Sequence, residues 1–528
     1  AMFRLAAVLA MAGGASHSSF AADRQLLNPW EVREEIKLAQ GVNPAAVKDY
    51  FPSFYDYLDT VLFHPSAGYY SSGRVDFAQH YRTFPIALSP SFGQMVTEQM
   101  FRMWDGMRKA GTLNATEKFT IAEFGAGDGS MAESVLDYID QMAATDARWM
   151  EFKNQSVYAC YDRSPALSEL QRKRNTRFGE RFQARQGDAT NPSATIGRGS
   201  LKGVVLSNEL PDCFSVHKVV LDESGSAEIA YTVPSVKRQV WANIAVSLPV
   251  NVRQLITKDD EAIYEKLFAG KERKKAAERD IVYLSRAGFS AILGAFNDSP
   301  GYEDNIGLLQ FQELYVPASV IPELADHIKK YAHAYAYALT KSGKGMVTYI
   351  NLGEAKFIQG AGAALKAGYV ITIDYGSNWD GILSQDFDHL RMYGPGSSQS
   401  HADPYHTPTL NDMTTDVNFS HIAAEGKTVG LQAVFFGPQH SLQRGTSIVL
   451  DEPPPSRSKS SADTADFNQW AGLFYSWEVY KVLIQQKDNT DGAYKYLGSP
   501  AEELGVQESG LSADERRKMG EIEKRMSR

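Results

Sequence analysis

The spacing of apolar residues changes along the chain, and each spacing predicts a different kind of element. Short unbroken apolar runs at residues 119–124, 157–161, 202–207 and 369–373 predict buried strands. Between the first two runs, Met131, Val135, Ile139 and Met142 fall at the spacing of one helix face. Because parallel strands need crossover connections, usually helices, this alternation predicts an α/β fold with a parallel sheet.

The remaining segments differ in character. An N-terminal helix face is predicted at residues 54–62, the periodicity is mixed at 224–345, the proline- and serine-rich residues 451–466 predict a flexible loop, and the charged residues 512–528 predict a surface helix. The predicted organisation is a targeting segment (1–22), an N-terminal helical segment with a substrate-site loop (23–115), a cofactor-binding core (116–223), an insertion for substrate or partner binding (224–345), the completion of the core (346–450), the flexible loop (451–466) and a C-terminal helical segment (467–528).

Composition excludes several classes of protein. The 528 residues are 43% hydrophobic and 22% charged, which is typical of a globular chain and excludes a fibrous or disordered one. The net charge is −9, so the chain as a whole lacks the cationic field that nucleic acid binding requires. Two cysteines, Cys160 and Cys213, cannot form a disulfide scaffold and are expected to be buried free thiols.

The N-terminal segment predicts targeting rather than a membrane span. A short apolar run follows Arg4, and Ser19 and Ala21 are small residues at the positions that a signal peptidase reads. The run is too short to cross a bilayer, and no other stretch predicts a transmembrane helix. A secretory signal peptide is therefore expected. A mitochondrial presequence is the alternative, because the segment lacks acids and is rich in serine, although it has only one arginine.

A glycine-rich loop follows the first predicted strand and precedes a helix. Its sequence, residues 123–130, is Glu-Phe-Gly-Ala-Gly-Asp-Gly-Ser. A dinucleotide fingerprint needs a small residue where Ser130 stands and places a pyrophosphate on the helix N-terminus, where acids are unfavourable. The acids Glu123 and Asp128 instead suit a cationic ligand without phosphate, such as S-adenosylmethionine. Gly125, Gly127 and Gly129 are the predicted contacts to its methionine part, with Glu123 beside them.

Two further acids follow the next strands. Asp162 ends the second strand, where its carboxylate can accept both ribose hydroxyls, and Asp188 is placed for the adenine amino group. A helix N-cap before Pro165 is the structural alternative for Asp162. These acids, ordered after alternating elements, favour S-adenosylmethionine over a nicotinamide cofactor.

The next strand ends in residues that suit an acceptor site. Asn208 offers a hydrogen-bond donor and acceptor, while Glu209 and Asp212 could orient a cationic group such as a guanidinium. A capped strand-to-helix loop is the structural alternative. His217 closes the same motif, and Tyr69 and Tyr70 are candidates for the acceptor channel or for core packing. His401, Asp403 and His406 fit a surface loop better than a metal site, so no metal is predicted.

Several of these motifs together resemble the MidA family of class I methyltransferases. Similar to that family are a Gly-Tyr-Tyr loop at 68–70, a Phe-Gly at 92–93, the Asp-Arg-Ser-Pro-Ala-Leu of 162–167, the Asn-Glu-Leu of 208–210 that leads to His217, the Ile-Asp-Tyr-Gly of 373–376, an Asp-x-Thr motif at 412–419 and the Tyr-Lys-Val-Leu of 480–483. The resemblance spans about residues 30–487. It implies a class I, Rossmann-like core that binds S-adenosylmethionine. Mitochondrial members of the family are complex I assembly factors that methylate arginine.

The chain also departs from that family. Ala87 stands where the family has a glutamate, and the segment 224–345 is longer and less regular. The expected activity is therefore methyl transfer to nitrogen, in a protein arginine or in a small guanidino or amine compound. A non-catalytic assembly factor that only binds S-adenosylmethionine is the alternative from another class.

Overall fold

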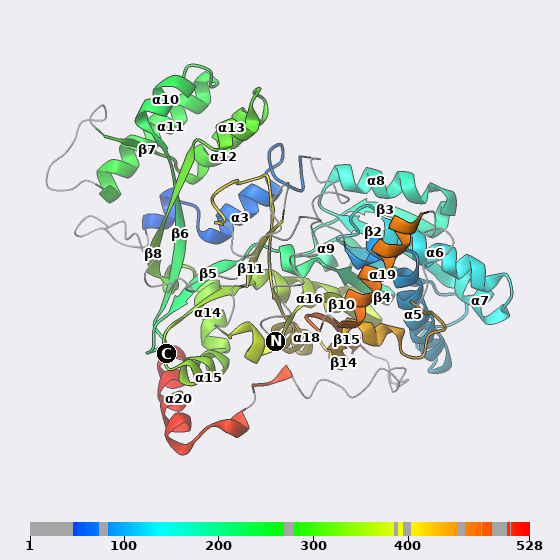
Figure 1. Ribbon diagram of the computed structural model, residues 1–528. Helices are drawn as coiled ribbons and strands as arrows, with labels where there is room; N and C mark the ends of the chain where they lie inside the picture. Colours follow the sequence, from blue (N-terminus) through cyan, green and yellow to red (C-terminus); the bar gives the residue numbers. More distant parts are fainter. Residues whose placement is uncertain are drawn as a thin grey trace.

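The computed structural model describes residues 46–72, 83–268, 279–384, 389–393, 403–450, 460–476, 478–487, 504–506 and 508–528. Within this part of the chain, the larger sheet has the strand order β14-β15-β10-β4-β1-β2-β3, with the short β13 beside β10 (Figure 1). The five strands from β10 to β3 are mutually parallel, and β15 is antiparallel to both of its neighbours. The strands are β1 Phe119–Phe124, β2 Ser156–Asp162, β3 Phe182–Gln186, β4 Leu201–Asn208, β10 Leu365–Ser377, β13 Val417–Asn418, β14 Gln432–Pro438 and β15 Tyr480–Lys487.

All four strands predicted from apolar runs are present, and the α/β prediction is confirmed. Both faces of the sheet are covered, which explains why its strands are unbroken apolar runs rather than alternating ones. Phe119 and Ile121 pack in one cluster with the first group of helices, while Ala122 and Phe124 pack on the opposite side with the second group. The first group is α4 Phe84–Ala87, α5 Ser91–Lys109, α6 Ser130–Ala143, α7 Ala147–Gln155 and α19 Ser461–Ser476; the second is α16 Leu352–Ala364 and α18 Phe419–Thr428, with α9 Pro192–Ile196 beside α16.

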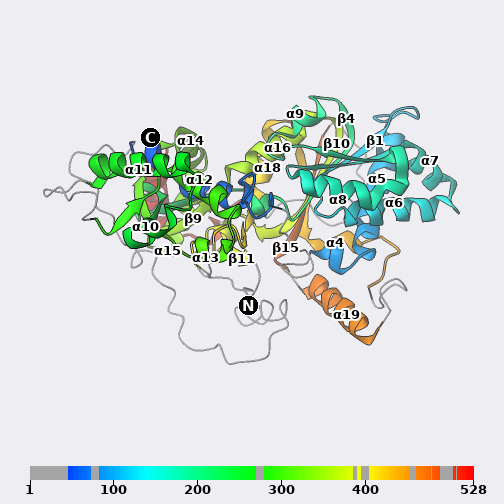
Figure 2. The ribbon, with the colours of Figure 1, turned by 90° about the horizontal axis from the view of Figure 1, so that it is seen from above.

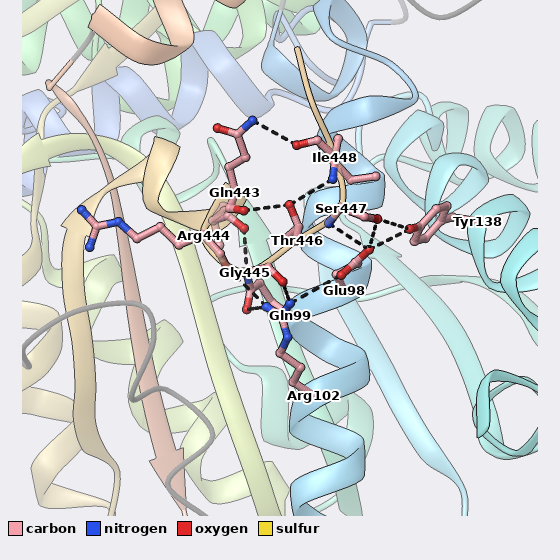
Figure 3. A network of polar contacts seen from close by, with 11 residues as sticks. Glu98, Gln99, Arg102, Tyr138, Gln443, Arg444, Gly445, Thr446, Ser447 and Ile448 are labelled. Carbon is pink, nitrogen blue, oxygen red and sulfur yellow. Dashed lines mark hydrogen bonds and ion pairs between the residues drawn. The ribbon is translucent and has the colours of Figure 1, made fainter. Parts of the chain in front are cut away.

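Polar contacts fix α5 to the segment that follows β14 (Figure 3). Gln99 donates from Nε2 to the carbonyl oxygen of Leu442 at 2.6 Å and to that of Arg444 at 3.2 Å. Glu98 accepts from Tyr138 Oη and from Ser447 Oγ, both at 2.8 Å. Since α5 and α6 pack on the same face of the sheet, this network ties a distant segment of the chain to that face.

The segment after β4 forms a second, antiparallel sheet. Its order in the described residues is β7-β6-β5-β9, with β8 on the other edge of β6. Figure 2 shows the two sheets in two lobes side by side. The strands are β5 His217–Leu221, β6 Ala227–Lys237, β7 Ile281–Tyr283, β8 Leu309–Pro317 and β9 Met346–Ile350, and the helices of this segment are α10 Arg238–Ile244, α11 Val250–Ile263, α12 Arg286–Asn297, α13 Tyr302–Ile306, α14 Pro322–Lys330 and α15 Ala332–Ser342.

Both ends of the described chain pack on this second lobe. Ser53 and Asp56 form a capping box that starts α3 (Phe54–Phe63), which follows α2 (Val47–Tyr50). Phe54 and Tyr57 on α3 pack into the core of the second sheet. The charged C-terminal helix α20 (Ala513–Met526) buries Met519, Ile522 and Met526 against the same lobe, near α15 in Figure 1.

Several smaller elements complete the fold. Part of the flexible-loop prediction is wrong, because α19 starts at Ser461 and its Phe467 and Phe474 are buried among core aromatics; residues 451–459 lie outside the described chain. The remaining elements are α8 Pro165–Asn175, α17 Trp379–Ile382, β11 Leu390–Tyr393, β12 Asp412–Thr415 and single turns of 3-10 or π helix.

Candidate functional site

The glycine loop between β1 and α6 has a backbone that other residues adopt with difficulty. Gly125, Gly127 and Gly129 have φ values of 69°, 52° and 81°, all in the left-handed region. A Cβ atom on Gly125 would lie 2.7 Å from Leu210 Cδ1, and one on Gly129 would lie 2.9 Å from Asn175 Nδ2. Glycine is therefore needed at both positions for conformation and for space.

Helix α8 supports this loop from the side. Gln171 donates from Nε2 to the carbonyl oxygen of Gly127, and Asn175 donates from Nδ2 to that of Gly129, both at 3.0 Å. Asp128 accepts a hydrogen bond from Ser130 N and forms an ion pair with Arg174 at 2.7 Å. The charge of Asp128 is therefore balanced by Arg174 of α8.

The Glu123 carboxyl also has hydrogen-bond partners within the protein. Its Oε2 accepts from Tyr158 Oη at 2.8 Å and from Cys160 Sγ at 3.8 Å, and only 3% of the residue is exposed. Burial raises the pKa of Glu123 to about 7. Both cysteines are buried free thiols, as expected. Glu123 thus lies beneath the loop, where its contacts are with β2.

Asp162 lies beside the loop, and Asp188 lies further out. The Asp162 carboxyl accepts from Ser164 N at 2.8 Å and from Gln171 Nε2 at 3.3 Å, so one amide group contacts both this acid and Gly127. Burial raises the pKa of Asp162 to about 6. Asp188 is exposed, and its Oδ1 accepts from the backbone and hydroxyl of Thr190.

A strained turn follows β4. Glu209 has a φ of 49°, an unusual value for a residue with a long side chain, and its N–H donates to Ile373 O at 2.8 Å. Asn208 donates from Nδ2 to Glu209 Oε1 at 3.2 Å. Backbone strain of this kind is often retained at functional sites. Leu210 packs over Gly125, so the turn lies directly against the glycine loop.

Four carboxyl groups gather at this turn. Asp212 N donates to Asp374 Oδ2 at 3.3 Å, and Asp412 contributes from β12. Burial, followed by the charge of Asp212, raises the pKa of Glu209 to about 8. Burial raises the pKa of Asp412 to about 7, with a contribution from the charge of Asp212, although the hydrogen bond from Tyr70 lowers it. Burial raises the pKa of Asp212 to about 6, and burial with the charges of Asp212 and Glu209 raises that of Asp374 well above its usual range. The cluster consequently holds protons near neutral pH.

The sequence prediction missed Asp374 and Asp412 as site residues. Asp374 follows a predicted buried strand directly, the same signal that identified Asp162. Asp412 opens the Asp-x-Thr motif of 412–419, but it does not end a predicted buried strand, and it enters the cluster through the β11–β12 pair.

The aromatic candidates have different surroundings. Tyr69 is 1% exposed and packs in the core of the second lobe, whereas Tyr70 donates from Oη to Asp412 Oδ1 at 2.6 Å. His217 starts β5 and stacks on Tyr55 with ring centroids 4.9 Å apart. Burial lowers the pKa of His217 to about 4.

His217 lines a cavity of about 430 Å³ between the N-terminal helices, the second sheet and α16. None of the four clustered acids lines this cavity. The structure thus brings Asn208, Glu209, Asp212 and Tyr70 together and places His217 in a different environment.

The described ranges contain neither a metal-binding cluster nor a membrane-spanning helix. No group of three or more histidine, cysteine or acidic residues there could hold a metal ion, and His401 lies outside those ranges. No helix in the same ranges is long and apolar enough to cross a bilayer.

Comparison with known proteins identifies the family to which the chain belongs. No curated protein matches the sequence. Among solved structures, the chain is similar to a COG1565 superfamily member from Burkholderia thailandensis bound to S-adenosyl-homocysteine, with 20% identity, a TM-score of 0.54, and coverage of 87% of this chain and 93% of the other. An uncharacterized COG1565 superfamily protein from the same organism has a TM-score of 0.50 with the same identity and coverage.

These structures share the class I methyltransferase fold with this chain. A family model for S-adenosyl-L-methionine-dependent methyltransferases matches residues 95–437, which is more than half of the chain and includes the glycine loop and all four clustered acids. The chain therefore belongs to the family of S-adenosyl-L-methionine-dependent methyltransferases.

Proposed function

We propose that the protein transfers a methyl group to the nitrogen of a cationic acceptor, and that this acceptor is the guanidinium group of a protein arginine. The observation that carries this proposal is the cluster of four buried carboxyl groups against the glycine loop. A guanidinium is planar, permanently charged and rich in donors, and it matches several carboxyl groups better than a carboxylate or phosphate acceptor would. The motif resemblance to arginine methyltransferases supports the same acceptor.

The residues of the glycine loop fit S-adenosylmethionine. Three left-handed glycines leave the loop backbone free of side chains, and the buried Asp162 carboxyl lies next to it, as a ribose diol requires. Arg174 pairs with Asp128 rather than standing free for a pyrophosphate. In the proposed site, Gly125, Gly127 and Gly129 admit the methionine part, Asp162 holds the ribose and Asp188 lies near the adenine.

The chemistry requires positioning and removal of one proton. The bound donor supplies a methyl group on a sulfonium. Asn208 and Asp212 orient the acceptor nitrogen, a C–N bond forms as the C–S bond breaks, and the electron pair of the broken bond stays on sulfur. The acceptor nitrogen then loses one proton, which Glu209 takes in its ionised form. A base with a pKa of about 8 suits that role near neutral pH.

The test uses the purified full chain with methyl-labelled S-adenosylmethionine and a protein extract, followed by digestion and mass spectrometry. Label on arginine, lost with Glu209→Gln, is the expected result. Label only on carboxylates or hydroxyls would overturn the cationic acceptor. Tight binding of S-adenosylmethionine with no transfer to protein or to small guanidino compounds would instead favour a non-catalytic assembly factor.

A further inference from the structure

Asp412 reaches the acceptor cluster from a distant part of the chain. It is the first residue of β12, it pairs with Tyr393 across the β11–β12 ladder, and 2% of it is exposed. Burial raises the pKa of Asp412, and the charge of Asp212 adds to that rise. A carboxyl that is buried this deeply needs a partner to offset the loss of hydration.

Tyr70 is one such partner and fixes the position of the carboxyl group. Its hydroxyl donates to Asp412 Oδ1 at 2.6 Å, and its ring stacks on Phe63 with centroids 5.5 Å apart. Tyr70 packs against the apolar cores of both lobes. Because the ring is held on two sides, the hydroxyl has little freedom to leave the carboxyl.

Two other acceptor atoms in the cluster lack donors. Asn208 Oδ1 and Asp212 Oδ1 have no hydrogen-bond partner in the described structure, although the two residues are 9% and 4% exposed. Leaving a buried acceptor unsatisfied is costly, and such atoms in a native protein call for an explanation. A ligand with several N–H donors would satisfy them.

We propose that Asp412, positioned by Tyr70, is an acceptor-binding residue that works with Asn208 and Asp212 to recognise a planar guanidinium. This inference rests on the proposed function and adds the residues that would select a guanidinium over other cations. Three acceptor groups, two from the turn after β4 and one from β12, match the five N–H donors of a guanidinium, whereas an alkylammonium has only three donors on one atom.

Charge balance makes this recognition depend on pH. Burial raises the pKa of all four carboxyl groups, and the charges of neighbouring acids add to that rise at Glu209, Asp374 and Asp412, so these three hold protons near neutral pH in the free protein. At Asp212 a hydrogen bond from Tyr375 and the charge of the buried Arg391 guanidinium oppose the effect of burial on the pKa. Entry of a cation favours the ionised carboxylates and expels protons. Binding should therefore release protons and become tighter as the pH rises toward 8.

Calorimetry with S-adenosyl-homocysteine present can test this, using N-acetylarginine amide as the probe and N-acetyl-lysine amide for comparison. The expected result is arginine-probe binding with proton release, measured in buffers of different ionisation enthalpy, and weaker binding of the lysine probe. Asp412→Asn should weaken arginine-probe binding roughly tenfold to a hundredfold, the usual loss for a charged hydrogen bond. Tyr70→Phe should weaken it less, because the carboxyl remains but is less fixed.

Tyr138→Phe is the matched control, since this hydroxyl donates to Glu98 in the α5 network instead. It should leave probe binding unchanged. Unchanged binding in Asp412→Asn, equal affinity for the two probes, or no arginine-probe binding by the wild-type protein at millimolar concentration would overturn the inference. Affinity for S-adenosylmethionine and the thermal midpoint separate a specific loss from misfolding. Failure of methyl transfer despite selective, Asp412-dependent arginine-probe binding would refute the proposed function and leave the role of Asp412 in guanidinium recognition intact.

Discussion

The substitution Glu209→Gln tests the acid–base role of this carboxyl group while keeping the size of the side chain. Burial and the charge of Asp212 raise the pKa of Glu209 to about 8. Glutamine has nearly the same shape but cannot accept the acceptor's proton. We expect unchanged affinity for S-adenosylmethionine and a loss of methyl transfer of roughly a hundredfold or more, which is the range for general base catalysis.

The same substitution should change how stability depends on pH. Between the usual pKa of 4.5 and about 8, the folded protein keeps a proton on Glu209 that the unfolded chain has released. The free energy of unfolding therefore falls as the pH rises through this window, by about 1.4 kcal/mol per pH unit for one proton. Glu209→Gln removes that fall. Above pH 8, removing this fall should raise the free energy of unfolding of the variant relative to the wild-type protein by on the order of 5 kcal/mol at most. The gain is smaller where neighbouring carboxyl groups share the proton.

Thermal unfolding from pH 5 to pH 9, followed by tryptophan fluorescence, measures this difference. The midpoint of the wild-type protein should decrease with pH more steeply than that of Glu209→Gln. Glu180→Gln, at an exposed position of the core lobe, is the matched control and should keep the wild-type slope. Parallel curves for wild type and Glu209→Gln would refute the buried, protonated state of Glu209.

Other substitutions test the loop, the α5 network and the second lobe. Gly129→Ala should weaken S-adenosylmethionine binding more than tenfold by calorimetry, because a left-handed φ costs about 1–2 kcal/mol without glycine and the methyl group would meet Asn175. Gly179→Ala, with a φ of 58° and open space around it, should leave affinity unchanged. Gln99→Ala should lower the unfolding free energy by about 1–3 kcal/mol without affecting that affinity, by urea unfolding and calorimetry. His217 has a folded pKa of about 4, so stability is lost as the pH falls below 6.5; His217→Gln should reduce that loss by about 1.4 kcal/mol per pH unit in acid unfolding.

The core sheet and the glycine loop could be predicted because their signals are local. An apolar run such as residues 119–124, followed at once by glycines and a helix face, specifies strand, turn and helix without information from elsewhere. Asp162 and Asn208 are identified by the same logic, since each ends a buried strand. The carboxyl ends of parallel strands meet at one edge, so these residues lie at the same edge of the sheet, on either side of β1.

The second lobe could not be predicted in the same way. Its strands pair over long separations, as β6 does with β8, and their residues are buried in patterns set by the partner rather than by local sequence. The contacts of the two loop acids could not be predicted from the sequence either. Asp128 and Glu123 look alike as charges near a glycine loop, and only packing shows that Arg174 and Tyr158 occupy them.

The proposed acceptor site lies where the two lobes meet. The chain leaves the core sheet through the turn that carries Glu209 and Asp212, builds the second sheet, and returns to this turn at Asn351, whose Nδ2 donates to Pro211 O at 2.8 Å. The segment that makes the second lobe thus begins and ends beside the clustered acids. Tyr70 packs against both lobes while it holds Asp412 in the cluster. In the proposed acceptor site, a movement of one lobe against the other would therefore shift Tyr70 together with the Asp412 carboxyl that it holds.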